Sequence, residues 1–255
     1  MVQVDVTNPP ILYNEQNRLK RRNIQATQSK RESFINVPQS NITTLLLVRH
    51  GETRWNIENR FQGHGDSPLT PKGREQSITL GRRLQGIQFD ELISSDLGRA
   101  METGALISRF TGHRLQTDHR LRERNYGILE GLQLDKIKGR HPDILERLGS
   151  NDPDYVIPGG ESYRQHYKRC IGFLEERTAD RPGATVVLVI HGGVLDCLFR
   201  HVAHLALDQP RCFTTTNASL AVFKHGRFYG TRRWVIETWG DIAHLKGIGQ
   251  YLGLG

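Results

Sequence analysis

The chain is organised around a short apolar run that ends in an arginine and a histidine. Residues 45–48 read Leu-Leu-Leu-Val, and Arg49, His50 and Gly51 follow at once. Four apolar residues bounded by polar ones are typical of a buried strand in a parallel sheet. Because ligands of open α/β sheets bind beyond the carboxyl ends of the strands, the pattern predicts that Arg49 and His50 lie at a binding site. Gly51 allows the backbone to turn sharply there.

This arginine and histidine have a specific chemical capacity. A neutral imidazole can attack phosphorus, and an adjacent guanidinium can hold phosphoryl oxygens through paired hydrogen bonds. Taken alone, an Arg-His-Gly triplet more often marks a solvated arginine beside a core histidine, since short motifs misfire often. The choice between these interpretations depends on the rest of the chain.

A second histidine stands at the end of a second predicted strand. Residues 185–190, TVVLVI, are apolar and β-branched, and His191 and Gly192 follow them. A helix predicted from Leu97 to about Phe110 places Arg99 in its first turn, just after a predicted strand at 91–94. An arginine taken alone is most often an ordinary surface residue, but a helix N-terminus and a guanidinium both favour an anion, so this position favours a contribution of Arg99 to the same kind of site.

The remaining pattern predicts an α/β domain. Thr70 and Pro71 are typical of a helix start, and that helix is expected to run to about Gly86. The helix after His191 is expected to bury Val194, Leu198, Val202 and Leu205. The other predicted elements are a strand at 115–117, one or two small helices within 132–158 with breaks at His141-Pro142 and Asp152-Pro153, a helix from about 163 to 178, and an antiparallel pair at 219–223 and 232–236.

Glu123 lies in a loop between Arg122 and Arg124. One interpretation is a structural carboxylate that is salt-bridged to one of these arginines. The other is a general acid, because the leaving oxygen of a phosphate ester needs a proton. Both interpretations stay open from the residues alone.

Length and composition exclude several classes of protein. The chain has 255 residues, of which 36% are hydrophobic and 24% charged, as in one large globular domain. We find no apolar run long enough for a membrane span and no signal-peptide pattern. Three scattered cysteines, without a Cys-x-x-Cys pair, predict neither a disulfide framework nor a zinc site, and a reducing cytoplasm is expected.

The basic balance of the chain does not identify a partner. The formal net charge is +8, and residues 1–40 hold six basic and three acidic residues. Such a balance suits nucleic acid, a membrane surface or an anionic small molecule. We predict a basic, disordered extension at 1–40, a domain at 41–246 and a loose tail at 247–255.

Taken together, the motifs resemble the histidine phosphatase superfamily, which includes phosphoglycerate mutase and its phosphatase relatives. The resemblance covers about residues 43–238, with the motifs in the expected order. It is carried by Leu47-Val48-Arg49-His50-Gly51-Glu52-Thr53 with Trp55-Asn56, Arg60 with Gln62-Gly63, Asp66 with Pro68-Leu69-Thr70, Ser94-Ser95-Asp96 with Arg99-Ala100 and Thr103, Glu123 with Tyr126-Gly127 and Glu130-Gly131, Pro158-Gly159-Gly160-Glu161-Ser162, and His191-Gly192-Gly193.

The resemblance implies a three-layer αβα sandwich with a mostly parallel central sheet, and a phosphohistidine intermediate on His50. It implies a phosphate clamp of Arg49, Arg99 and His191, with Glu123 as proton donor and later as the base for water. The residues that it implies for binding are Asn56, Gln62, Gly63, Tyr126 and Gly192. No cofactor and no metal are expected, because two guanidiniums and an imidazole supply the positive donors that phosphoryl transfer needs.

Within the family, the chain is expected to be a phosphatase of a small phosphate monoester. Mutases of the family carry a longer segment with a paired arginine after the third motif, whereas residues 132–158 are short and offer only Lys136, Lys138, Arg140 and Arg147 as substitutes. The alternatives are a cofactor-dependent phosphoglycerate mutase and, from another class, a catalytically weak basic binding protein on the same fold. We expect a small phosphorylated substrate and no membrane or nucleic-acid partner; a homodimer stays open.

Overall fold

The computed structural model describes residues 41–248. The predicted extension at 1–40, and all but the first two residues of the predicted tail at 247–255, lie outside this range. The helices are α2 (Arg54–Ile57), α3 (Pro71–Gln85), α4 (Gly98–Thr111), α5 (Leu134–Arg140), α6 (Pro142–Gly149), α7 (Tyr163–Asp180) and α8 (Gly192–Ala203), with short 3-10 turns at His119–Leu121, Gly127–Leu129 and Ala243–Leu245.

A six-stranded sheet forms the centre, with the strand order β3-β2-β4-β1-β5-β6. The first four strands of this order run parallel, whereas β5 is antiparallel to both β1 and β6. The mostly parallel sheet that was predicted is therefore confirmed. The strands are β1 (Thr43–Arg49), β2 (Glu91–Ser94), β3 (Leu115–Thr117), β4 (Thr185–Ile190), β5 (Leu220–Phe228) and β6 (Thr231–Asp241).

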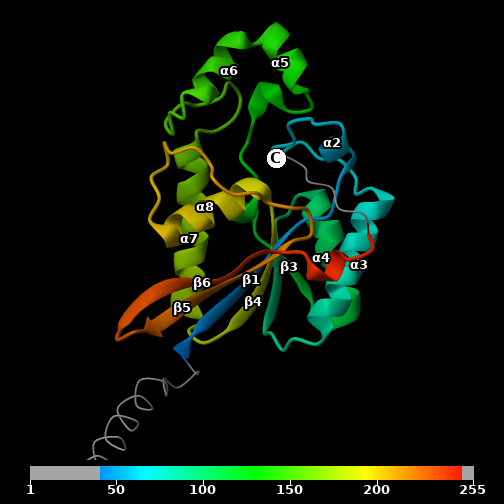
Figure 1. Cartoon of the computed structure of the whole chain (residues 1–255), viewed down its shortest axis with the longest axis vertical. Coiled ribbons are helices and arrows are strands. Elements are labelled where there is room, and N and C mark those ends of the chain that lie inside the picture. Colours follow the sequence, from blue (N-terminus) through cyan, green and yellow to red (C-terminus); the bar gives the residue numbers. More distant parts are fainter. Residues whose placement is uncertain (1–40, 249–255) are drawn as a thin grey trace, which may run out of the picture. The chain divides into compact units, whose positions relative to one another are not determined.

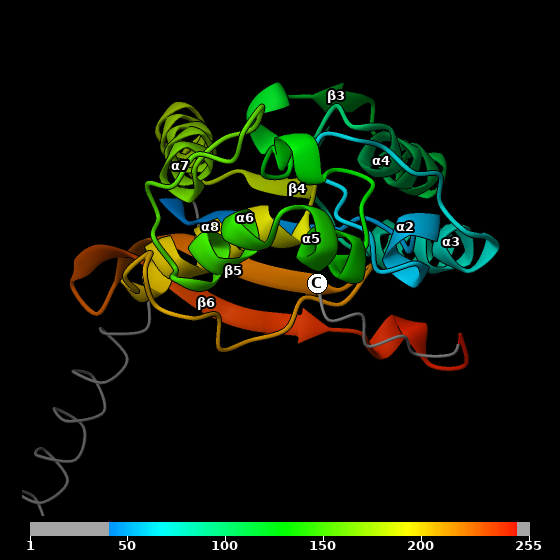
Figure 2. The ribbon, with the colours of Figure 1, turned by 90° about the horizontal axis from the view of Figure 1, so that it is seen from above.

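Alternating side chains of the central strands build two separate cores. Leu45 and Leu47 of β1 pack with α7 and α8 on one face, while Leu46 and Val48 pack with α3 and α4 on the other. Helices therefore cover both faces, as Figures 1 and 2 show. A strand that is apolar on both sides is what a sheet between two helical layers requires, which explains the continuous Leu-Leu-Leu-Val run.

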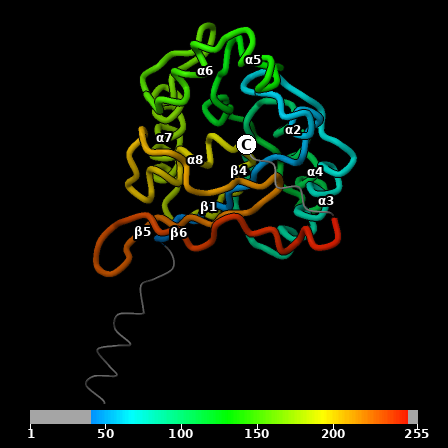
Figure 3. Tube along the Cα trace, turned by 45° about the horizontal axis from the view of Figure 1, so that its top comes forward, coloured from blue at the N-terminus to red at the C-terminus, as the bar shows by residue number. Residues whose placement is uncertain are grey.

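Helices α5 and α6 form a small unit with its own core of Leu129, Ile137, Ile144 and Ile157. The helix break falls at His141, and Pro142 takes the first position of α6, as predicted. This unit lies beyond the carboxyl ends of the strands, above the site region in Figures 1 and 3.

No helix among residues 41–248 combines the length and the apolar character needed to cross a bilayer.

Two predicted boundaries are wrong. Helix α8 ends at Ala203, because His204 adopts the left-handed conformation (φ 55°), and Leu205 lies half-buried beyond the helix rather than on its buried face. The terminal hairpin is longer than predicted: β5 runs to Phe228, and β6 starts at Thr231. The turn consists of Tyr229 and Gly230, and both have positive φ. The polar residues before the turn still pair through their backbones, which composition alone does not indicate.

Candidate functional site

The two predicted histidines meet because their strands are neighbours. Strands β1 and β4 pair in parallel, with Arg49 opposite Ile190, so His50 and His191 leave the sheet at the same edge. The backbone N–H of His50 donates to the carbonyl of Ile190 at 3.0 Å. The centroids of the two imidazole rings are 5.2 Å apart. Residues 141 positions apart in the sequence thereby form one site, at the edge where the strand pattern placed it.

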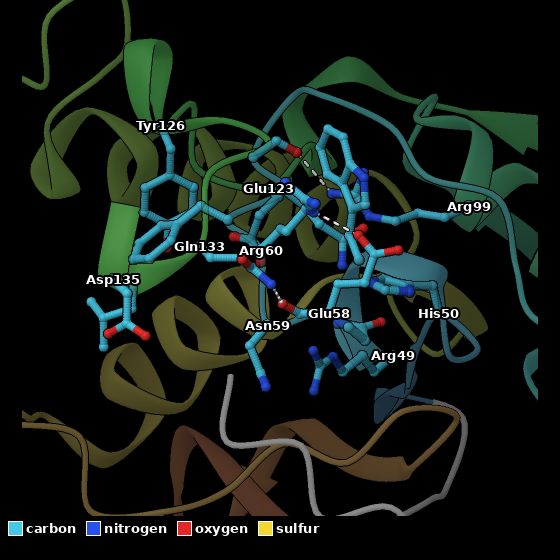
Figure 4. Close-up of a pocket in the computed structure, with 16 residues that line it drawn as sticks. Arg49, His50, Glu58, Asn59, Arg60, Arg99, Glu123, Tyr126, Gln133 and Asp135 are labelled. Atoms are coloured by element: carbon cyan, nitrogen blue, oxygen red, sulfur yellow. Dashed lines mark hydrogen bonds and ion pairs between the residues drawn. The ribbon is translucent and has the colours of Figure 1, made fainter. Parts of the chain in front are cut away.

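A cavity of about 630 Å³ opens over this edge. Arg49, His50 and Arg99 gather on one side of the cavity, and Tyr126, Gln133 and Asp135 lie on the other (Figure 4). His191 and Gly192 are not among the lining residues: His191 is fully buried behind His50, and Gly192 packs against Arg49. The predicted site residues that do line the cavity are Arg49, His50, Asn56, Gln62, Gly63, Arg99, Glu123 and Tyr126.

His50 is held in the form that a nucleophile needs. Its Nδ1 lies 2.8 Å from the carbonyl oxygen of Gly51, which can only accept, so Nδ1 carries the hydrogen and Nε2 carries the lone pair. Burial, together with the charges of Arg99 and Arg49, holds the pKa of His50 well below its usual value. The imidazole is therefore neutral at neutral pH.

The two arginines are buried and held by backbone carbonyls, and Arg99 also pairs with Asp66, its Nη1 lying 3.2 Å from the carboxylate. Arg49 donates through Nη1 to the carbonyl of Thr215. Arg99 donates through Nη2 to Gly63 O at 2.8 Å and through Nη1 to Gly65 O at 2.9 Å. Burial lowers the pKa of Arg49 to about 10, so this guanidinium keeps its charge at neutral pH. The site therefore presents positive charge that cannot move away.

Several buried polar atoms of this site have no hydrogen-bond partner within the protein. They are Nε of Arg49, Nε of Arg99, both ring nitrogens of His191 and Oε1 of Gln62. A buried donor without a partner costs about 1–3 kcal/mol, and more when it is charged. A ligand with several negatively charged oxygens would satisfy the guanidinium donors at once, which makes the cluster suited to an oxyanion.

Glu123 is held by backbone donors rather than by an arginine. Gly193 N donates to its Oε2 and Arg124 N to its Oε1, each at 2.8 Å. The interpretation that Glu123 is salt-bridged to a neighbouring arginine is wrong. Arg122 pairs instead with Asp96, at 2.6 Å, and the side chain of Arg124 donates to backbone carbonyls.

Sequence reasoning assigned no role to Asn217 and Glu130. Asn217 Nδ2 donates to His50 O at 3.0 Å and lies 3.3 Å from Asn56 Oδ1, which leaves the amide nitrogen of Asn56 for a ligand. Glu130 accepts from the backbone N–H groups of residues 64, 65 and 126 at 2.6–3.0 Å. Gly63 has φ of +56°, and a Cβ there would lie 2.2 Å from Glu130 Oε1, so a glycine is required at this turn.

The outer half of the cavity carries aromatic and polar side chains. Arg60 belongs to this half, and it is held by Glu58 at 2.6 Å and by the carbonyl of Gly131 at 2.7 Å. The basic residues proposed above as substitutes for the mutase arginine pair, Lys136, Lys138, Arg140 and Arg147, are exposed and not among the lining residues. The other outer residues are Trp55, Asn59, Phe61, Gln133, Leu134 and Asp135.

Comparison with known proteins identifies the relatives of this chain. The model of the histidine phosphatase superfamily (branch 1) matches residues 45–242. A probable phosphoglycerate mutase GpmB of Cronobacter sakazakii is 37% identical over 202 residues, which cover 79% of this chain and 94% of the relative. The corresponding protein of Salmonella choleraesuis is 36% identical over the same shares.

Two similar solved structures differ in what their names say of activity. A mycobacterial glucosyl-3-phosphoglycerate phosphatase, described in complex with VO3, is 30% identical at a TM-score of 0.68; the match covers 77% of this chain and 98% of that one. Bacillus stearothermophilus YhfR is 32% identical at a TM-score of 0.70, with 80% and 99% covered. The fold is thus shared with proteins named as phosphatases and with proteins named as mutases.

Proposed function

Because the chain belongs to the histidine phosphatase superfamily, we propose that it is a phosphatase that hydrolyses a small phosphate monoester through a phosphohistidine on His50. One observation carries this proposal: the neutral Nε2 of a buried histidine faces a cavity where guanidinium nitrogens lack partners within the protein. A phosphoryl group in that cavity would meet a nucleophile and positive donors together.

The first step transfers the phosphoryl group to the enzyme. The lone pair of His50 Nε2 attacks phosphorus, and the bond from phosphorus to the ester oxygen breaks. Arg49 and Arg99 stabilise the charge on the equatorial oxygens, with His191 buried beside them. Glu123, entering in its protonated form, gives its proton to the leaving oxygen, so the alcohol departs neutral.

The second step returns the enzyme to its starting state. Glu123 is now a carboxylate and takes a proton from a water molecule. The oxygen of that water attacks phosphorus as the bond to Nε2 breaks, and inorganic phosphate leaves. The backbone N–H of Gly193, at the start of α8, holds the carboxyl group of Glu123 in place for both steps. No step in this scheme calls for a metal ion, because Arg49 and Arg99 supply the charge. We expect the reaction to take place in the cytoplasm.

Phosphoglycerate mutase is the second candidate, because the Cronobacter and Salmonella relatives, 37% and 36% identical, carry that name. The outer cavity favours the phosphatase. A phosphoglycerate carries a carboxylate, yet Glu58 and Asp135 stand on the outer wall, and Glu58 already holds Arg60. A leaving group that is neutral and rich in hydroxyl groups fits this wall better than a second anion.

Replacing the proposed acid tests the mechanism. Glu123→Gln should slow the hydrolysis of alkyl phosphates by about 10²–10⁴-fold, the usual worth of a general acid. Phosphorylation of His50 by p-nitrophenyl phosphate should slow much less, because that leaving group departs without a proton. Glu175→Gln, on the exposed face of α7, is the matched control and should react like the wild type. Equal losses on both substrates would mean that Glu123 is a structural residue.

Two further measurements separate the alternative functions. With 3-phosphoglycerate, a phosphatase releases inorganic phosphate, whereas a mutase forms 2-phosphoglycerate with little release. We expect inorganic phosphate to dominate, and dominant isomerisation would favour the mutase. No turnover of any phosphate monoester, including p-nitrophenyl phosphate, would support the binding protein instead.

A further inference from the structure

Three potential metal ligands meet in the core between α7 and α8. His166 and Cys170 lie one turn apart on α7, and Cys197 faces them from α8. Their ligand atoms all lie within 4.8 Å of one another, and all three residues are fully buried. The proposed reaction uses none of them. The core of α7 and α8 on one side of the cluster is apolar, while Glu123 and Arg169 approach the cluster from its polar side.

The spacing of these atoms suits a tetrahedral ion. Sγ of Cys197 lies 3.7 Å from Nδ1 of His166. Zinc bonds of about 2.3 Å to sulfur and 2.0–2.1 Å to nitrogen place tetrahedral ligand atoms about 3.5–3.8 Å apart. The longest separation in the cluster, within 4.8 Å, needs only small side-chain rotations to reach this range. The geometry is therefore close to that of a three-ligand site.

The other side of the His166 ring faces Glu123. Nε2 of His166 is buried without a hydrogen-bond partner and lies 3.9 Å from Glu123 Oε1. Histidines that bind a metal almost always donate their second ring N–H to a carboxylate, a carbonyl or water. The arrangement therefore matches a carboxylate–histidine–zinc site, in which a carboxylate contacts one ring nitrogen and the metal binds the other. Here Glu123 lies on the Nε2 side of the His166 ring, and the sulfur of Cys197 lies on the Nδ1 side.

The local charges favour a divalent ion. Two thiolates and a neutral imidazole around Zn²⁺ make a neutral complex, which an apolar core accepts far better than a net charge. The guanidinium of Arg169, 3.9 Å from Cys170 Sγ, is balanced by Glu161 at 2.6 Å. A second cavity of about 200 Å³ reaches the cluster from the side of His166, which lines it together with Tyr163 among others; the two cysteines do not line it.

We propose that His166, Cys170 and Cys197 form a site for a zinc-class divalent ion, joined through His166 to Glu123. The ion would tie α7 to α8 and fix the ring of His166 with its N–H toward the Glu123 carboxylate. The site is separate from the phosphate cavity, and the proposed reaction does not pass through it.

Titration of the full-length, reduced protein with Cd²⁺ tests the site. Cadmium bound to thiolates absorbs in the ultraviolet, whereas cadmium on histidines or carboxylates does not. We expect a saturable thiolate–cadmium band in the wild type and in Cys212→Ser, which removes the exposed cysteine. The band should be largely lost in Cys197→Ser and in Cys170→Ser. No band in the wild type, or an unchanged band in both variants, would overturn the proposal.

Two further measurements keep the test decisive. If the serine variants do not fold, X-ray absorption of the zinc complex of Cys212→Ser reports the ligands directly: two sulfur ligands support the site, and only nitrogen and oxygen ligands overturn it. For the link to Glu123, Glu123→Gln should weaken cadmium binding by about 10–100-fold, as loss of an outer-shell partner does, while Glu175→Gln should not. Equal affinity in Glu123→Gln and wild type would overturn the link.

Discussion

Folding of this protein should become weaker as the pH falls below the ordinary pKa of histidine. His50, His166 and His191 are at most 3% exposed, and burial holds the pKa of each well below its usual value. In the unfolded chain the same residues take up protons near pH ~6.5. A group whose pKa is depressed in the folded state contributes stability above the unfolded pKa and loses it as the pH falls.

The size of this effect follows from the number of buried histidines. Between about pH 7.5 and pH 5.5, protonation of the unfolded chain lowers the free energy of unfolding by about 1.4 kcal/mol for each histidine that stays neutral in the folded protein. The three fully buried histidines together lose about 4 kcal/mol, a large part of the 5–15 kcal/mol typical of a domain. His64, His201, His225 and His244 are partly buried and have pKa values shifted in the same direction, so they add to the loss.

Urea unfolding at the two pH values measures the loss. His50→Gln should reduce the difference in unfolding free energy between them by about 1.4 kcal/mol. His119→Gln, which changes an exposed histidine, should keep the wild-type difference. If a folded His50→Gln protein keeps the full difference, His50 is protonated in the native state at the lower pH. The assignment of a neutral nucleophile held by its surroundings would then be refuted.

Three shorter predictions concern the reaction. His50→Ala should abolish turnover and the acid-labile phosphoenzyme, while circular dichroism stays native; turnover near the wild-type rate would contradict the nucleophile. EDTA should leave the phosphoryl-transfer chemistry intact, because Arg49 and Arg99 supply the charge; loss that is restored by a divalent ion in Cys197→Ser, which lacks the proposed ion site, would contradict this reasoning. Deletion of residues 1–40 should leave the rate nearly unchanged, since the motifs begin at Leu45, and a large fall in a folded product would place this segment at the site.

Local patterns were enough to predict most of the sheet and its helices. The apolar run before Arg49 and the TVVLVI run both became buried central strands, because a strand covered on two faces has no polar position to interrupt it. Thr70 caps α3 through a hydrogen bond to Gly73 N, as its sequence position indicates. Such signals lie within a few residues of the element that they define.

Other features depend on contacts between distant segments, which local patterns do not encode. Asn217 holds the carbonyl of His50 across 167 positions, and a single asparagine before a strand reads as an ordinary turn residue. Cys197 and Cys170 were read as scattered thiols, because only the packing of α8 on α7 brings their sulfur atoms together. The long hairpin was underestimated for a related reason: its ladder is made by backbone groups, which carry no side-chain signature.

The position of Glu123 shows how the two halves of the site depend on each other. Its carboxylate accepts from Gly193 N in the first turn of α8, directly after His191 and the end of β4. Its backbone carbonyl accepts from Arg169 on α7, at 2.7 Å. A shift of α7 against α8 would therefore change the distance between the proposed proton donor and the proposed phosphate clamp. An ion bound by Cys170 and Cys197 would act on that same contact, so the proposed metal site and the proposed catalytic site share a structural element although they share no ligand.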